Sequence, residues 1–305
     1  MKILVTGASG LLGLNLCLLM HEAHQIVGVD RSKLERTPFE LIKADLLEPS
    51  ASSRLIETVR PQAVIHTAAI ADIDACEADP VGAQRLNADY PGELAEVCAR
   101  RGVHLLHIST EAVFDGKTPR PYTEDDAPNP LGVYARTKLD GENAVRSVNA
   151  DAIVARVNFF GWSLSGSRSL SEHFFYKLLK GKQCFGFVNV IFCPMFVSDL
   201  AVILVQMLEE GLSGLYHVVG SEAISKFDFG VRLAQRFGFD AGLITPIAVE
   251  ESGLRARRSH NLSLSVHKLS TALGIEIPGV STGIEQFYTQ YQQGYPQKIR
   301  SYQQS

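Results

Sequence analysis

The sequence predicts a protein of the α/β class, with a doubly wound parallel sheet and a smaller C-terminal lobe. Short β-rich runs alternate with helical runs through the first half of the chain, and such alternation implies βαβ units with parallel strands. The strand runs are almost continuously apolar, which suits a sheet that is covered on both faces. Past about residue 158 the alternation fades, so a different architecture is expected there.

The expected elements follow from this pattern in chain order. Strands are expected over 2–7, 25–30, 39–45, 63–69, 104–110, 152–157 and 214–220, and helices over 53–61, 92–102, 172–181, 197–210, 225–238 and 282–293. Ser225 precedes Asp228 by three residues, which is a helix-capping pattern. We expect a dinucleotide-binding domain made of 1–157 and 187–219, and a substrate lobe made of 158–186 and 220–300.

Composition narrows the classes of partner. Apolar residues make up 46% and charged residues 20% of the chain, and the net charge is −4, so neither a nucleic acid nor a membrane is expected as a partner. No signal peptide or membrane-spanning run is recognised. The five cysteines are scattered and odd in number, which predicts free thiols in a reducing, cytoplasmic setting. No metal site is expected, because the histidines lack acidic partners at ligand spacing.

Three glycines, Gly7, Gly10 and Gly13, follow the first strand and open a helical run. A dinucleotide pyrophosphate that approaches a helix N-terminus needs bare backbone there, for the tight turn, the close approach and the packing of helix on strand. The spacing is G-x-x-G-x-x-G rather than G-x-G-x-x-G. The alternative is a packing turn without a ligand.

The second strand ends at Asp30, and Arg31 follows it directly. A carboxylate in this place accepts the hydroxyls of an adenosine ribose and repels a 2′-phosphate, which favours NADH. Arg31 could instead pair with that phosphate, so NADPH stays open. The alternative for Asp30 is a solvated acid at the end of a strand.

Tyr134 and Lys138 lie four residues apart in an expected helix, which places them on one face. A lysine ammonium about 6 Å from a phenol contributes about 3 kcal/mol at an effective dielectric constant of about 20, or about two pKa units toward the phenolate. The pair therefore predicts a tyrosine with a lowered pKa that exchanges a proton with a carbonyl or alcohol oxygen. Ser109 and Thr110 end a strand, where active groups of such sheets collect.

Several longer stretches carry a resemblance to a known family. TGASGLLG, HTAA, ISTEAVFDG, PYTEDDAPNPLGVYARTKLDGE and FVSDLA occur in this order, and the chain resembles the extended short-chain dehydrogenases/reductases, in particular the dTDP-4-dehydrorhamnose reductase family. The resemblance implies a Rossmann-type domain with a small substrate lobe. It also implies an NAD(P)-dependent oxidoreductase that transfers hydride from NADH or NADPH to the 4-keto group of a nucleotide-linked deoxysugar.

The resemblance implies roles for particular residues. Thr110, Tyr134 and Lys138 would form the catalytic set: Tyr134 protonates the carbonyl oxygen, Lys138 lowers its pKa and holds the nicotinamide ribose, and Thr110 orients the oxygen. Ser109, Glu111 and Arg258 would contact the substrate. The residues expected to bind the cofactor are Gly7, Ser9, Gly10, Leu11, Leu12, Gly13, Asp30, Arg31, Asp45, Leu46, Ala68 and Ala69, together with Tyr134 and Lys138.

The chain departs from the family pattern at several positions, so other functions than this reductase stay open. Glu111 and Ala112 stand where the family has aspartate and tyrosine, and Ser259 and Ser265 replace a proline and an aspartate near Arg258. A sugar-nucleotide epimerase of the same superfamily is one alternative. Another is a non-catalytic nucleotide-binding protein that resembles the regulatory beta subunit of methionine adenosyltransferase. A homodimer is compatible with either reading.

Overall fold

A seven-stranded parallel sheet forms the centre of the protein. The computed structural model describes residues 1–31, 34–253 and 259–303, and within them the strands run in the order β11–β6–β5–β4–β1–β2–β3. Their bounds are β1 (Lys2–Thr6), β2 (Gln25–Asp30), β3 (Glu40–Lys43), β4 (Ala63–His66), β5 (His104–Thr110), β6 (Ile153–Val157) and β11 (Gly214–Val218). The direction in which strands are added reverses at β1, and ligands of such sheets bind above this point.

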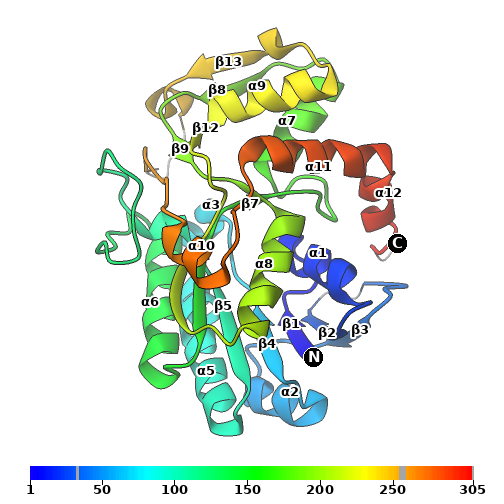
Figure 1. Ribbon diagram of the computed structural model, residues 1–305, viewed down its shortest axis with the longest axis vertical. Coiled ribbons are helices and arrows are strands. Elements are labelled where there is room, and N and C mark those ends of the chain that lie inside the picture. The colour runs from blue at the N-terminus through cyan, green and yellow to red at the C-terminus, as the bar shows by residue number, and fades with distance from the viewer. Residues whose placement is uncertain (32–33, 254–258, 304–305) are drawn as a thin grey trace.

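Helices cover both faces of the sheet (Figure 1). The helices α2 (Ala51–Val59), α5 (Tyr90–Arg101) and α6 (Val133–Val148) cover one face, and α1 (Leu11–Met20) and α8 (Val197–Glu209) cover the other. Along β1, Leu4 packs into the first layer and Ile3 and Val5 into the second, because successive side chains of a strand point to opposite faces. The expected doubly wound sheet is therefore confirmed.

The smaller lobe is built from two-stranded ladders and helices (Figure 1). Three pairs form it or link it to the sheet: β7 (Phe159–Phe160) with β10 (Met195–Phe196), β8 (Cys184–Phe187) with β13 (Ile244–Ile247), and β9 (Ile191–Phe192) with β12 (Ile224–Ser225). The helices α7 (Leu170–Leu179), α9 (Lys226–Phe237) and α11 (Val280–Gln292) pack around aromatic side chains. Trp162 stacks on Phe287 with ring centroids 3.8 Å apart, and the lobe thereby has its own apolar interior.

Local sequence explains how these helices begin. Ser225 accepts a hydrogen bond from the backbone N–H of Asp228 and caps α9, as the sequence predicts. Ser169 and Glu172 form a complete capping box at the start of α7. At the other end of α5, Gly102 has a φ of 63°, a conformation that favours glycine.

Some segments lie on the other side of the predicted domain boundaries. β9 falls within 187–219 but pairs with β12 of the smaller lobe. α10 (His267–Leu273) falls within 220–300 but packs on β11 of the central sheet. The C-terminal α12 (Tyr295–Arg300) also returns to the sheet, where the Tyr295 hydroxyl donates to Asn15 of α1. The chain thus passes between the two parts more often than its periodicity indicates.

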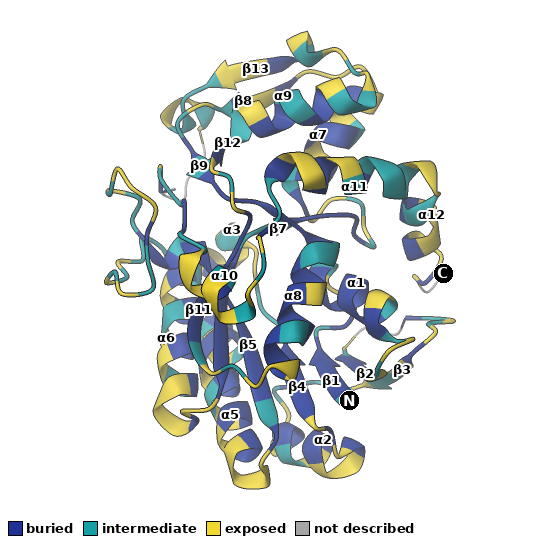
Figure 2. Cartoon of the chain, in the orientation of Figure 1, coloured by how far each residue is buried: buried dark blue, intermediate teal, exposed yellow. Residues whose placement is uncertain are grey.

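The strands of the central sheet are mostly buried, and the covering helices α2, α5 and α6 expose their outer sides (Figure 2). The remaining elements are short. They are α3 (Ile73–Ala78), α4 (Pro80–Gln84), the π-helical turn Arg85–Asp89 and the 3₁₀ turns Glu111–Val113, Ala241–Leu243 and Val249–Ser252. No helix in the described part of the chain combines the length and apolar character that a membrane crossing requires.

Candidate active site

A cleft of about 440 Å³ lies over the first βα turn, at the carboxyl edge of the sheet. We call it the glycine-loop cleft. Its lining includes every loop and strand-end residue expected to bind a cofactor: Gly7, Ser9, Gly10, Leu11, Leu12, Gly13, Asp30, Arg31, Asp45, Leu46, Ala68 and Ala69. The fold therefore brings together residues that the sequence places on four separate segments.

Glycine is required in this loop because its backbone packs closely against other backbone segments of the protein. Gly7 has a φ of 71°, and a Cβ there would lie 2.8 Å from the backbone of Ala68. A Cβ at Gly13 would overlap the carbonyl oxygen of Gly7. Helix α1 begins after Gly10 without any side-chain cap, so its first N–H groups are directed toward the cleft. Such an end is suited to a phosphate group.

Two carboxylates lie at strand ends in the same cleft. The Asp30 carboxylate accepts a hydrogen bond of 3.0 Å from the backbone N–H of Ser9, which ties the end of β2 to the loop. Asp45 accepts one of 2.9 Å from the backbone N–H of Leu47. Arg31 is exposed beside Asp30. The cleft therefore offers backbone donors at the loop and acceptors at the strand ends.

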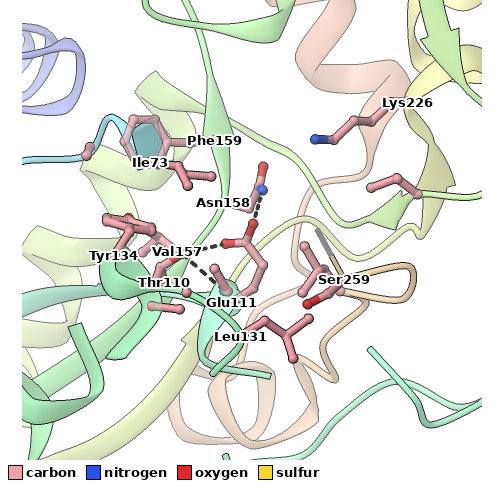
Figure 3. Close-up of a pocket in the computed structure, with 16 residues that line it drawn as sticks. Ile73, Thr110, Glu111, Leu131, Tyr134, Val157, Asn158, Phe159, Lys226 and Ser259 are labelled. Atoms are coloured by element: carbon pink, nitrogen blue, oxygen red, sulfur yellow. Dashed lines mark hydrogen bonds between the residues drawn. The ribbon is translucent and has the colours of Figure 1, made fainter. Parts of the chain in front are cut away.

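A second cavity, of about 260 Å³, lies beside the first. We call it the tyrosine cavity. Thr110, Glu111, Tyr134 and Asn158 line it from the sheet side, and Lys226 enters it from the smaller lobe (Figure 3). Ala71 and Phe159 line both cavities, so the two share a wall. A ligand in the tyrosine cavity would therefore lie next to a ligand in the glycine-loop cleft.

Strand and helix ends hold Thr110 and Tyr134 in place. Thr110 is the last residue of β5, and its hydroxyl accepts a 3.2 Å hydrogen bond from the backbone N–H of Ala112. Tyr134 lies in the first turn of α6, next to Val133, whose backbone N–H donates to Glu77. Asn87 joins α6 to the segment after β4 through hydrogen bonds to Ile70 and Thr137.

The phenol of Tyr134 has a raised pKa, which corrects the sequence prediction of a lowered one. Burial is the largest cause, and the Glu111 carboxylate adds to it, because both disfavour a phenolate. The nearby Thr110 hydroxyl opposes them weakly. The expected lowering by Lys138 is therefore outweighed by burial.

Lys138 is buried beneath the tyrosine cavity and lines neither cavity. Its Nζ donates a 2.6 Å hydrogen bond to the carbonyl oxygen of Ile108 and lies 3.5 Å from Nε2 of His107. Burial lowers the pKa of Lys138 to about 8, and the Glu142 carboxylate partly opposes this. The residue is close to neutralisation under ordinary conditions, which suits a group that exchanges protons.

Two buried histidines, His107 and His66, lie beneath Lys138. His107 stacks on His66 with ring centroids 5.3 Å apart, and Nδ1 of His66 lies 2.7 Å from the hydroxyl of Thr6. Burial lowers the pKa of His66 to about 3, and that of His107 well below its usual range, with Lys138 adding to both. Both imidazoles are therefore neutral at pH 7.

Glu111 is buried between two hydrogen-bond donors. Its Oε1 accepts from Nδ2 of Asn158 at 2.5 Å, and its Oε2 accepts from the Thr110 hydroxyl at 3.2 Å (Figure 3). Burial raises the pKa of the Glu111 carboxyl, whereas Asn158 and Lys226 act in the opposite direction. An acid that lies beside the phenol therefore influences its proton affinity directly.

The other predicted substrate contacts are placed differently. The Ser109 hydroxyl donates to Glu142 at 2.5 Å, and Glu142 also forms a buried ion pair with Arg156. Ser109 lines neither cavity, so the structure does not bring it to the tyrosine cavity; alternation along β5 turns it away from its neighbour Thr110. Arg258 lies outside the described residues.

Some lining residues were not found by sequence reasoning. Asn158 directly follows β6 and could have been recognised by the same strand-end rule that selected Thr110. Lys226 and Arg168 come from the second half of the chain, where no sequence motif marked them. Within the described ranges, no cluster of three side chains suitable for a metal ion occurs.

Comparison with known proteins places the chain in a family. The model of the RmlD substrate binding domain matches residues 1–293. The chain belongs to this family. The match agrees with the resemblance that the sequence motifs carry, and it covers both the central sheet and the smaller lobe.

The chain is also similar to named proteins of two kinds. The chain is 32% identical over 278 residues to the probable low-salt glycan biosynthesis reductase Agl14 of Haloferax volcanii, covering 90% of this chain and 93% of that protein. It is also 32% identical over 285 residues to methionine adenosyltransferase 2 subunit beta of Rattus norvegicus, covering 90% and 83%. The reductase and the methionine adenosyltransferase subunit are thus equally similar to this chain in sequence.

A solved structure has the same fold as this chain. The dTDP-4-dehydrorhamnose reductase of Bacillus anthracis, solved in complex with NADP, superposes with a TM-score of 0.86 at 24% identity and covers 95% of this chain and 99% of that one. The Rossmann-type architecture is therefore confirmed.

Proposed function

We propose that this protein is an NADH- or NADPH-dependent reductase that acts on a keto group of a nucleotide-linked sugar, as in the dTDP-4-dehydrorhamnose reductases. The observation that carries the proposal is the shared wall: Tyr134 and Thr110 line a cavity that adjoins the glycine-loop cleft at Ala71 and Phe159. A reductase needs a proton donor next to the place where a dinucleotide ends.

The residues of the glycine-loop cleft fit a dinucleotide. The uncapped start of α1 and the bare glycine loop would take the pyrophosphate. Asp30 would accept the hydroxyls of the adenosine ribose, and Asp45 and Leu46 would lie near the adenine. When bound, the nicotinamide supplies a hydride to the carbonyl carbon of the substrate.

Tyr134 would supply the proton that completes the reduction. The phenol is protonated at neutral pH, because burial and Glu111 disfavour the phenolate, and this is the form needed to protonate a carbonyl oxygen as a hydride arrives at carbon. Thr110 would orient that oxygen with its hydroxyl. Lys138 lines neither cavity, so its contact with the nicotinamide ribose stays what the resemblance implies; its pKa of about 8 suits it to return a proton to Tyr134.

The tyrosine cavity would hold the sugar between the sheet and the smaller lobe. Glu111 and Asn158 present a carboxyl and an amide to it, groups that pair with sugar hydroxyls. Lys226 brings a positive charge from the lobe, suited to the negative charge of a nucleotide diphosphate. Arg258 stays a predicted substrate contact.

The proposal is tested by following the oxidation of NADH and NADPH with a panel of dTDP-, UDP- and GDP-linked 4-keto sugars. Turnover with at least one member is expected, and Tyr134→Phe should remove it while dinucleotide binding persists. Normal dinucleotide binding without turnover on the whole panel would contradict the reductase. Tightly retained NAD in the purified protein, with interconversion of sugar epimers, would favour the epimerase alternative.

A second candidate is a nucleotide-binding subunit of a methionine adenosyltransferase assembly. The observation that favours it is the 32% identity to methionine adenosyltransferase 2 subunit beta over 90% of this chain. The test is co-elution of this protein with purified methionine adenosyltransferase catalytic subunits in size-exclusion chromatography. Co-elution without ketone reduction would support this candidate, whereas reduction without co-elution would support the reductase.

A further inference from the structure

Among the residues that the structure describes, the second half of the chain contributes one basic side chain to the glycine-loop cleft. Arg31 and Arg168 are its basic lining residues among the described positions, and Asp30 and Asp45 its acidic ones. Arg31, Asp30 and Asp45 come from the ends of neighbouring strands. Arg168 instead comes from the loop between β7 and α7, beyond residue 160, and no motif in that loop indicated a contact with a nucleotide.

The loop that carries Arg168 is held firmly by a buried carboxylate. Glu172 accepts hydrogen bonds from the backbone N–H and the hydroxyl of Ser163, both at 2.7 Å, and from the backbone N–H of Arg168 at 3.0 Å. The hydroxyl of Ser169 donates to the carbonyl oxygen of Gly161 at 2.8 Å. The backbone at Arg168 is therefore positioned before any ligand binds.

The same loop is attached to α1, the helix that starts at the glycine loop. Nδ2 of Asn15 donates to the carbonyl oxygen of Trp162 at 2.9 Å and also to that of Leu11. A Cβ at Gly161 would lie 3.7 Å from the side chain of Leu11, the first residue of α1. The loop therefore lies next to the N-terminal end of α1.

The side chain of Arg168 is exposed. Among residues 1–31, 34–253 and 259–303, no carboxylate forms an ion pair with its guanidinium. Arg300, from the same side of the molecule, is instead packed against Tyr176. A guanidinium that lines a cleft while only its backbone is anchored is available for an anionic ligand.

We propose that Arg168 binds the pyrophosphate of the dinucleotide across the cleft from the glycine loop; this rests on the proposed function. The loop N–H groups and the α1 N-terminus contact one side of the two phosphates, and the Arg168 guanidinium contacts the other. Arg31, beside Asp30 at the ribose, is placed for a 2′-phosphate instead. Arg168 should therefore contribute to the affinity for both NADH and NADPH, whereas Arg31 should contribute mainly to that for NADPH.

The test is calorimetric titration of NADH, NADPH and ADP-ribose into wild-type protein, Arg168→Gln, Arg31→Gln and Arg146→Gln. Arg146 is an exposed arginine of α6 that lines neither cavity, and it serves as the matched control. We expect Arg168→Gln to weaken all three ligands by about tenfold, the scale of one charge-assisted hydrogen bond. Arg31→Gln should weaken NADPH more than NADH, and Arg146→Gln should change nothing.

Each outcome bears on the proposal. Equal weakening of NADH, NADPH and ADP-ribose by Arg168→Gln supports it, and a smaller loss of affinity in Arg168→Lys adds to that support, because lysine keeps the charge without the planar fork. Unchanged affinity in Arg168→Gln overturns it and leaves the proposed function standing. A loss confined to NADPH overturns the pyrophosphate contact, and wild-type protein that binds none of the three overturns both proposals.

Discussion

The two cavities at the carboxyl edge of the sheet are built in different ways. The glycine-loop cleft is lined mainly by four segments between residues 7 and 71, which include the bare glycine loop. The tyrosine cavity is lined by side chains from segments between residues 71 and 262, which the fold draws together from both parts of the molecule. A cleft of the first kind is suited to a ligand shared by many proteins, and one of the second kind to a particular substrate.

This difference is also a difference in electrostatics. The cleft presents N–H groups and an uncapped helix start, whose partial charges do not depend on pH. The tyrosine cavity contains groups whose pKa values are displaced by burial and by each other, among them Tyr134 and Glu111. Substitutions in the two cavities should therefore have separable effects on dinucleotide affinity and on the pH dependence of turnover.

The largest expected effect is that of removing the phenol hydroxyl. Tyr134→Phe should lower kcat by about a thousandfold, because it deletes the proton donor of the reaction. The affinity for NADH or NADPH should stay within about twofold of wild type, because Tyr134 lines the tyrosine cavity and not the cleft. Steady-state kinetics and a binding titration measure the two quantities. A parallel loss of both would contradict the separation of the cavities.

Gly13→Ala should damage the cleft and leave the tyrosine cavity's residues in place. The new Cβ would overlap the carbonyl oxygen of Gly7, and we expect a loss of about 2 kcal/mol in unfolding free energy together with weaker dinucleotide binding. Urea unfolding and calorimetric titration measure these changes. Gly279→Ala is the control, because a Cβ there would meet its nearest neighbour, Ser221, at an ordinary 3.5 Å.

The buried imidazoles beneath the cavities should make the fold sensitive to acid. His66 has a folded-state pKa of about 3, whereas it is about 6.5 in the unfolded chain. The unfolded state therefore binds a proton first, and stability falls as the pH drops from about 6.5 toward 3. At pH 5 the loss for this residue is about 2 kcal/mol. His66→Gln should reduce the difference between urea unfolding at pH 7 and pH 5 by this amount, and an undiminished difference would refute the assignment.

The smallest expected effect concerns the acid next to Tyr134. The Glu111 charge raises the pKa of the phenol, so Glu111→Gln should lower it. The phenol must be protonated to act as an acid, and turnover is lost as the pH rises past its pKa. The alkaline limb of the kcat profile should therefore move to lower pH. Glu96→Gln, at an exposed glutamate of α5, should leave the profile unchanged.

The two cavities also differ in how many of their lining residues could be predicted from the sequence. The predicted residues of the glycine-loop cleft were recognised because they stand at the ends of apolar runs or among closely spaced glycines, as Gly7 and Asp30 show, but Arg168 was not recognised. In the tyrosine cavity, Thr110 and Tyr134 were recognised by position, but Asn158 and Lys226 were not. Ser109 was expected beside Thr110, yet strand alternation turns its hydroxyl to Glu142.

The sequence by itself determined the parallel sheet, the glycine loop and the places of Thr110 at a strand end and Tyr134 in a helix, because these depend on periodicity and on chemistry within a few neighbouring residues. The tertiary structure alone decided that Arg168 enters the cleft, that Lys226 enters the tyrosine cavity and that the pKa of Tyr134 is raised. Those outcomes depend on burial and on contacts between segments far apart in the chain, which no local pattern of residues encodes.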